Sequence, residues 1–132
     1  MKLRLSSIVG WTCALLVAAL NLFAAVMKFV PVDPSSDSAA FMQKLGLTTD
    51  MEHVLGVLEF AIVVLFLIPR TSTVGFVLMI GYMGGILATM LTHGLTSMDA
   101  LMIYVAFALL TISAWFRNPE LTARLLKKPV TI

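Results

Sequence analysis

The sequence predicts an all-α integral membrane protein, folded as a four-helix antiparallel bundle with a short amphipathic helix in the first outer loop. Hydrophobic residues make up 60% of the 132 residues and charged residues only 12%, and the mean hydropathy is +1.01. Four apolar segments are each long enough to cross a bilayer at about 1.5 Å per residue. We therefore expect a single transmembrane domain over 1–132, with spans at about 6–28, 50–68, 73–93 and 98–116.

The first span follows Lys2 and Arg4 and is longer than the apolar core of an ordinary signal peptide, so we expect it to be retained. One face of it carries small residues and ends in two polar ones, at helical spacing. This face consists of Ala14, Ala18, Asn21, Ala25 and Lys28. The amide of Asn21 is a candidate partner for Glu59 or for a ligand, or it simply joins two helices.

A hydrophilic connection over 30–50 follows the first span. Two prolines end the preceding helix, and Ser36 or Asp37 is placed to cap a short helix that runs to Leu45 before Gly46 ends it. The apolar side chains of this segment predict that it lies on the membrane or covers the helix ends.

The second span carries Glu59 at its middle. A carboxylate there costs about 3 kcal/mol on insertion scales, so it needs a partner, a water-filled cavity or a proton. Glu52, Gly56 and Glu59 lie on one helical stripe, along which we expect any function to lie. Two structural alternatives remain: Thr49 and Glu52 fit a capping box, and a protonated Glu59 can donate one hydrogen bond to a neighbouring helix.

The third span has a small-residue face beside a polar stripe. A GxxxG motif predicts close helix packing on the small face, either within the chain or between two chains. The small face consists of Gly81, Gly85, Ala88 and Thr92. The adjacent stripe, which we expect either to face Glu59 or to serve packing, consists of Tyr82, Gly85, Thr89 and His93.

The fourth span opens at a second capping box, Thr96 with Asp99, and ends at Arg117 before Asn118 and Pro119. Four spans put both termini on one side of the membrane. The positive-inside rule makes this side cytoplasmic, because it holds most of the basic residues and leaves only Lys28 and Lys44 outside. The cytoplasmic set is Lys2, Arg4, Arg70, Arg117, Arg124, Lys127 and Lys128.

Several classes of function are disfavoured by the residues present. The lone Cys13 permits no intramolecular disulfide, and the basic residues flank spans rather than forming a face for nucleic acid. No catalytic triad, phosphate loop or nucleotide fingerprint is present. A metal site between His53 and His93 is conceivable, but no spacing requires it, so we expect neither metal ligands nor catalytic residues.

The stretch 28–94 holds an LG-x-x-E helix that ends in LxPRT, followed by a GY-x-GG-x-x-A-T pattern in the third span. The residues of these motifs are Leu55, Gly56, Glu59, Ile68, Pro69, Arg70, Thr71, Gly81, Tyr82, Gly84, Gly85, Ala88 and Thr89. With them, the stretch resembles the DoxX-like family of small bacterial four-span membrane proteins.

The resemblance implies a protein of the bacterial inner membrane. Relatives in the wider DoxX group include a subunit linked to thiosulfate:quinone oxidation and partners of membrane redox complexes, and distant animal relatives resemble assembly factors or cargo receptors. The paired cysteines of neighbouring thiol-oxidoreductase families are absent, which puts disulfide chemistry in doubt. The cofactor is unknown, with a quinone or a lipid as candidates.

We expect an accessory or ligand-binding protein. The sequence leaves open whether it is an enzyme, and it favours no catalytic activity of the chain on its own. The expected partners are membrane lipid, a second copy of the chain or a membrane redox partner. The alternatives are an assembly factor for other membrane proteins and a proton-coupled transporter that uses Glu59. The candidate ligand-binding residues are Glu59, Asn21, Tyr82, Thr89, His53 and Lys28, and the candidate packing residues are Gly56, Gly81, Gly84, Gly85 and Ala88.

Overall fold

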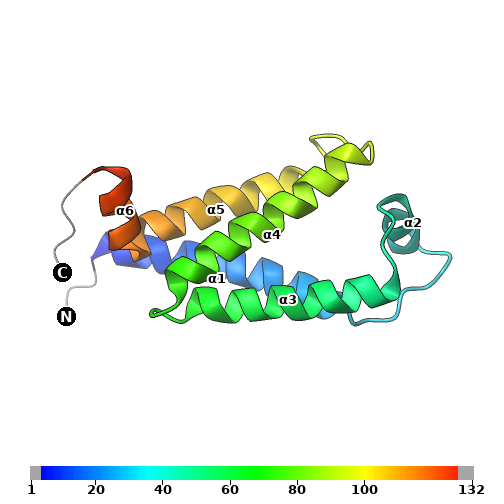
Figure 1. Cartoon of the computed structure of the whole chain (residues 1–132), viewed down its shortest axis with the longest axis horizontal. Helices are drawn as coiled ribbons and strands as arrows, with labels where there is room; N and C mark the ends of the chain where they lie inside the picture. The colour runs from blue at the N-terminus through cyan, green and yellow to red at the C-terminus, as the bar shows by residue number, and fades with distance from the viewer. Residues whose placement is uncertain (1–3, 128–132) are drawn as a thin grey trace.

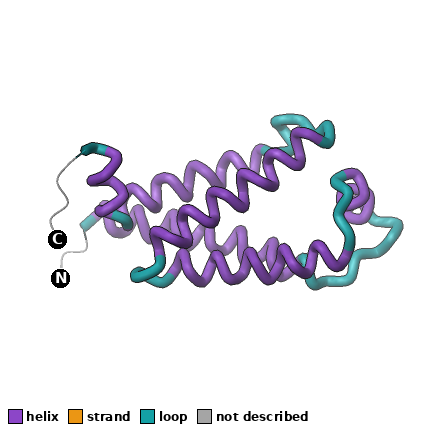
Figure 2. Tube along the Cα trace, in the orientation of Figure 1, coloured by secondary structure: helices purple, strands orange, loops and turns teal. Residues whose placement is uncertain are grey.

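The computed structural model describes residues 4–127 and is helical without strands over that range (Figure 1, Figure 2). Four long helices run along the molecule: α1 (Leu5–Met27), α3 (Thr49–Leu67), α4 (Ser72–Thr92) and α5 (Leu101–Arg117). Two helices are short: α2 (Asp37–Lys44) and α6 (Pro119–Leu125). The start of α1, the α3–α4 turn and α6 lie at one end, whereas α2 and the α4–α5 loop lie at the other (Figure 1). The predicted all-α class is confirmed.

Within residues 4–127, α1 and α4 are each long and apolar enough to cross a membrane. A third crossing is counted if α5 and α6, which meet at an angle of 98°, are taken as one bent span. Helix α3 is not among these candidate spans, and it carries three carboxylates, Asp50, Glu52 and Glu59, in its 19 residues. Helix α5 alone is short, at 17 residues.

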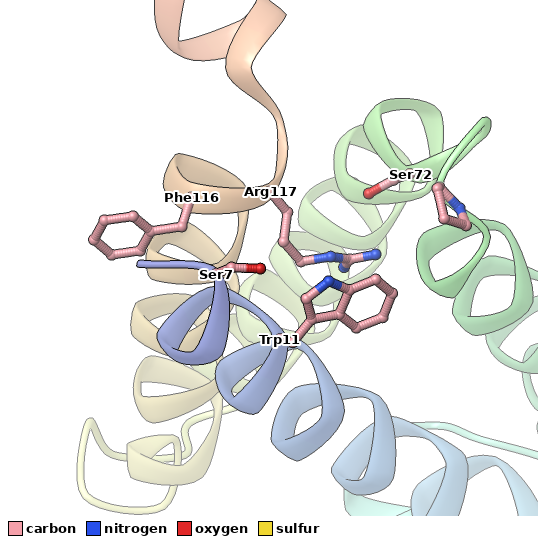
Figure 3. Close-up of a pocket in the computed structure, with 6 residues that line it drawn as sticks. Ser7, Trp11, Ser72, Phe116 and Arg117 are labelled. Carbon is pink, nitrogen blue, oxygen red and sulfur yellow. The ribbon is translucent and has the colours of Figure 1, made fainter. Parts of the chain in front are cut away.

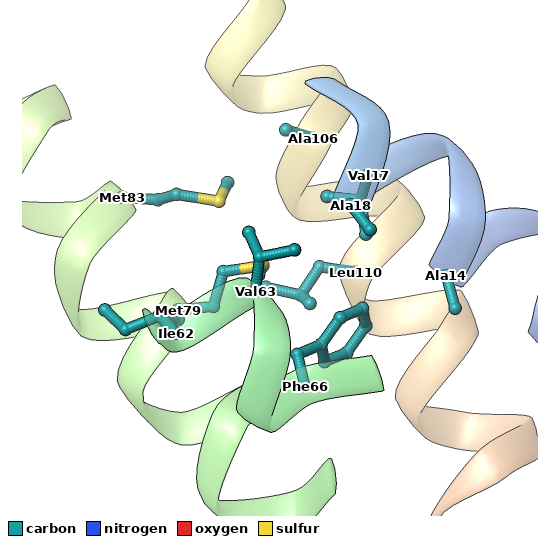
Figure 4. Close-up of a cluster of buried hydrophobic side chains, with 10 residues drawn as sticks. All are labelled: Ala14, Val17, Ala18, Ile62, Val63, Phe66, Met79, Met83, Ala106 and Leu110. Atoms are coloured by element: carbon teal, nitrogen blue, oxygen red, sulfur yellow. The ribbon is translucent and has the colours of Figure 1, made fainter. Parts of the chain in front are cut away.

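The core is formed where the four long helices meet. Helix α1 packs on both α3 and α5, α3 packs on α4, and the contact between α4 and α5 is smaller. Figure 4 shows side chains from all four helices converging between the ribbons. Because lipid is as apolar as these side chains, close packing holds such a core together more than exclusion of water does. The cluster consists of Ala14, Val17, Ala18, Ile62, Val63, Phe66, Met79, Met83, Ala106 and Leu110.

The turn between α3 and α4 is tight. Pro69 prevents α3 from continuing, and the Thr71 hydroxyl donates to the Leu65 carbonyl oxygen at 2.8 Å. A Cβ atom on Gly75 would overlap the backbone of Phe66, so the first turns of α4 reach α3 only because residue 75 has no side chain. This contact fixes Phe66, which is fully buried, at this end of the molecule.

Helix α2 begins and ends close to where the sequence predicts. The Ser36 hydroxyl accepts from the backbone N–H of Ala39, and the chain leaves the helix through Gly46 at φ +71°. No side chain of α2 itself is buried, so its predicted apolar side is not packed against the long helices. Instead, Leu45 directly after α2 packs with Met90 and the end of the α4–α5 loop.

Helix α3 begins one residue earlier than predicted. Thr48, not Thr49, is its N-cap, and the Thr48 hydroxyl accepts from the backbone N–H of Met51 at 3.3 Å. The predicted Thr49–Glu52 capping box is therefore wrong, because Met51 occupies the third helical position and Glu52 follows it.

The Thr96–Asp99 box does form, but it closes a turn before α5 rather than the helix itself. The Thr96 N–H donates to Asp99 Oδ2 at 2.8 Å, and the Asp99 N–H donates to the Thr96 hydroxyl at 3.3 Å. Regular α-helix starts only at Leu101, three residues after the predicted start of the span. Lys2 and Lys128, which contribute to the predicted charge asymmetry, lie outside the described residues.

Candidate functional site

Three helices converge on the carboxylate of Glu59. This side chain is 3% exposed, and its Oε2 accepts from Lys28 Nζ at 2.7 Å and from the Tyr82 hydroxyl at 3.1 Å. Lys28 is the C-cap residue of α1, Glu59 belongs to α3, and Tyr82 belongs to α4. These three residues form the Lys28–Glu59–Tyr82 cluster.

The relative lengths of α1 and α3 bring Lys28 to Glu59. A Cβ atom on Gly56 would lie 2.7 Å from the Phe29 ring and 3.2 Å from the Ala25 carbonyl oxygen, so Gly56 is level with the last turn of α1. Residues 49–55 of α3 therefore extend past α1 by about 10 Å at 1.5 Å per residue. Glu59 lies one turn further in, where the Lys28 side chain reaches back along α1.

The cluster joins a buried anion to a cation that keeps some contact with the surroundings. Lys28 is 15% exposed, and its ammonium also donates to the Ala24 carbonyl oxygen at 3.3 Å. Pairing reduces the cost of burying both charges, although such a pair rarely stabilises a protein more than apolar side chains of the same size would. An ammonium has three donors, and the structure assigns two of them, so Lys28 can give one more hydrogen bond to an incoming acceptor.

Asn21 does not join this cluster. Its amide donates to the Val17 carbonyl oxygen at 2.9 Å and contacts the Met83 sulfur at 4.0 Å. In the described part of the chain, Asn21 therefore makes no hydrogen bond to Glu59. Its contacts connect α1 to α4, which is the helix-joining alternative that the sequence leaves open.

His53 and Thr89, two further predicted ligand-binding residues, also lie apart from Glu59. The His53 ring stacks on Phe29, with centroids 5.3 Å apart and planes 12° from parallel. The Thr89 hydroxyl donates to the Gly85 carbonyl oxygen of its own helix at 2.8 Å. Of the six predicted ligand-binding residues, only Lys28, Glu59 and Tyr82 bond to one another.

The predicted packing residues fall into two groups. Gly56 is in close contact with the end of α1, as described above. On α4, a Cβ atom added to Gly81, Gly84 or Gly85 would meet nothing within 4 Å, and Ala88 is exposed. The GxxxG motif therefore faces outward from the described chain, where another protein or lipid can reach it.

A second polar cluster at the opposite end was missed by sequence reasoning. The Arg117 guanidinium lies over the rings of Trp11 and Phe66, at 4.2 Å and 4.9 Å from their centroids. Its Nη2 donates to the Phe66 carbonyl oxygen at 3.2 Å, which satisfies one of the free carbonyls at the end of α3. A proline that ends a helix indicates that its last carbonyl groups are free. It does not indicate which distant residue will bond to them.

Next to it, Asn118 joins the α5–α6 junction to the start of α4. Asn118 is 2% exposed, and its amide nitrogen donates to the hydroxyls of Ser72 at 3.2 Å and Thr73 at 2.9 Å. The carboxylate of Glu120 accepts from the Thr73 hydroxyl. Within residues 4–127, no three His, Cys, Asp or Glu side chains are grouped as a metal site.

Helices long and apolar enough to cross a bilayer are typical of a small helical membrane protein, and here a buried ion pair joins the end of α1 to α3. The chain belongs to the DoxX-like family, whose model matches residues 12–114. This confirms the resemblance seen in the sequence, and the matched range includes all three residues of the Lys28–Glu59–Tyr82 cluster. Searches of curated proteins and of solved structures gave no match.

Proposed function

We propose that this chain is an accessory protein of the bacterial inner membrane, with α1, α3, α4 and α5 crossing the bilayer and both termini in the cytoplasm. The excess of basic residues at the end that holds the start of α1, the α3–α4 turn and α6 supports this orientation. Pairing of Glu59 with Lys28 supports a transmembrane α3, because it offsets part of the cost of carrying a carboxylate into the membrane.

The bundle holds a lipid- or quinone-like ligand beside the Lys28–Glu59–Tyr82 cluster. The observation that carries this proposal is the convergence of an ammonium and a phenol from two helices on one buried carboxylate oxygen. The remaining donor of Lys28 suits a quinone carbonyl or the oxygen of a lipid head group. Wider DoxX relatives that work with quinone-linked redox complexes suggest a redox complex as the partner.

The test compares ligand content in the wild type and in a charge-free double variant, Lys28→Met with Glu59→Leu. Each protein is purified in mild detergent, its bound molecules are extracted, and mass spectrometry identifies them. The double variant leaves no lone charge behind, so we expect it to fold and to lose a ligand that the wild type holds in stoichiometric amount. A folded double variant with unchanged ligand content would contradict the proposal.

The outward face of α4 favours a second candidate, an interaction or assembly partner of another membrane protein. A Cβ atom added to Gly81, Gly84 or Gly85 would meet no atom of the described chain within 4 Å. Such small residues let a second helix approach closely. We expect Gly85→Leu to abolish a cross-linked membrane complex that the wild type forms. Val105→Leu, which adds bulk to the exposed face of α5, is the matched control and should leave the complex intact.

A further inference from the structure

A pocket lies where the start of α1, the α3–α4 turn and the end of α5 meet. Its volume is ≈ 220 Å³, and it is lined by Ser7, Trp11, Pro69, Ser72, Phe116 and Arg117. Figure 3 shows the Arg117 side chain reaching across the pocket above Trp11, with Ser7 and Ser72 on either side in this view. The pocket is smaller than the roughly 300–1,000 Å³ that drug-sized ligands occupy, so it suits a single small head group.

The charge in this pocket is not balanced. Among residues 4–127 the only salt bridge is the one between Lys28 and Glu59, so Arg117 has no carboxylate counter-ion there. The carboxylate of Glu120, three positions further on, accepts a hydrogen bond from the Thr73 hydroxyl instead. The rings of Trp11 and Phe66 and the Phe66 carbonyl oxygen offset part of the cost of this partly buried guanidinium, and an anion in the pocket would offset more of it.

The hydrogen-bonding capacity of the pocket is also unfilled. Arg117 Nη2 donates to the backbone at the end of α3, but Nη1 is buried and has no partner. The Ser72 hydroxyl accepts from the Asn118 amide, which leaves its own proton available for donation. Arg117 Nη1 and the Ser72 hydroxyl are both donors, and a guanidinium with added hydroxyls is the donor set that phosphate oxygens match. Asn118 Oδ1, a buried acceptor without a partner among the described residues, belongs to a residue that does not line the pocket.

The surroundings place the pocket at the level of lipid head groups. Trp11 and Phe116 line it and are 39% and 43% exposed, and Trp115 beside them is 46% exposed. Aromatic side chains gather at the boundary between hydrocarbon and water, which is the depth of lipid phosphates.

We propose that this pocket binds a phosphate group, carried by an anionic membrane lipid. The site lies at the other end of the molecule from the Lys28–Glu59–Tyr82 cluster, so this proposal and the proposed ligand in the bundle can be tested separately. Free phosphate offers the same chemistry, and the experiment distinguishes the two sources.

The experiment measures binding and thermal stabilisation of the full chain in mild detergent. The probes are short-chain phosphatidylglycerol, a diacylglycerol with the same tails and no phosphate, and inorganic phosphate. We expect saturable stabilisation by phosphatidylglycerol and none by the diacylglycerol. Equal stabilisation by inorganic phosphate at the same concentration would assign the site to free phosphate and overturn the lipid source, and no response to either phosphate would overturn the proposal.

Variants locate the binding. Arg117→Gln should weaken phosphatidylglycerol binding about ten- to hundredfold, as expected for loss of charge-assisted hydrogen bonds. Arg70→Gln removes an exposed charge from the neighbouring turn and should change binding by less than about threefold. Because Arg117 also packs on Trp11 and caps α3, Ser7→Ala serves as a milder second variant, and binding unchanged by it and by a folded Arg117→Gln would overturn the assignment.

Discussion

Phe29 and Gly56 meet where α1 ends against α3, and this contact sets the register of the two helices. A Cβ atom at residue 56 would lie 2.7 Å from one carbon of the Phe29 ring and 3.2 Å from the backbone oxygen of Ala25. The ring can move, but the backbone oxygen can yield only if α1 and α3 separate. Lys28 reaches Glu59 in this register, so the contact also positions the candidate site.

Adding one methyl group at chosen glycines tests this register. Gly56→Ala should lower stability by about 1–3 kcal/mol, because the added atom overpacks the contact. Gly85→Ala should stabilise α4 by up to about 1 kcal/mol, since nothing lies within 4 Å and alanine favours a helix. Thermal unfolding in detergent measures both, and equal effects at the two positions would refute the predicted register.

The buried ion pair predicts strong coupling between Lys28 and Glu59. Lys28→Met and Glu59→Leu should each cost about 3–5 kcal/mol, because each leaves its partner charged and unpaired. The double variant should lose much less than the sum of the two single losses. A double-mutant cycle from unfolding curves measures the coupling, and additive losses would show that the two side chains do not interact.

Removing one hydroxyl tests the third member of the cluster. Tyr82→Phe should cost about 1.5–3 kcal/mol, the range for a hydrogen bond to a charged group. Tyr104→Phe removes the same atom from a residue that is 39% exposed and should have little effect. If the two tyrosine variants unfold at the same temperature, the bond from Tyr82 to Glu59 is not present in solution.

Acid should open the turn that precedes α5. Hydrogen bonds from the Thr96 backbone N–H and hydroxyl hold the pKa of Asp99 below its ordinary value of 3.8. A depressed pKa means that the ionised form stabilises the turn above pH 3.8, and that this contribution is lost as the pH falls through the lower folded value. In the wild type, amide exchange at Thr96 should rise over that pH range. In Asp99→Asn, whose side chain does not titrate, exchange should show no such rise.

Much of the fold follows from the apolar pattern alone. The four long helices lie within about three residues of their predicted limits, because prolines, glycines and polar connections mark the ends of apolar segments. Thr48 and Thr49 show the limit of such reasoning, since two adjacent threonines are equivalent as caps until the helix register is known.

The candidate site was predicted residue by residue, but not as an assembly. The cost of a carboxylate in a membrane points to Glu59, and helix faces point to Lys28 and Tyr82. The sequence offers as one alternative that Tyr82 faces Glu59, but it does not pair Lys28 with Glu59. Pairing depends on how far α3 extends beyond α1, which no local pattern encodes. The sequence identifies Arg117 only as the end of a span. Its contacts, Trp11 and Phe66, come from helices far away in the sequence, so no local pattern predicts them.

The ion pair also bears on how the chain enters the membrane during synthesis. Lys28 precedes Glu59 by 31 residues, so in the proposed topology α1 reaches the membrane before α3 does, and its ammonium arrives unpaired. An insertase that releases helices one at a time would have to place this charge unpaired, whereas one that holds α1 until α3 emerges would release the two helices with this ion pair already formed. In the proposed topology, the ion pair therefore favours insertion of α1 and α3 as a pair.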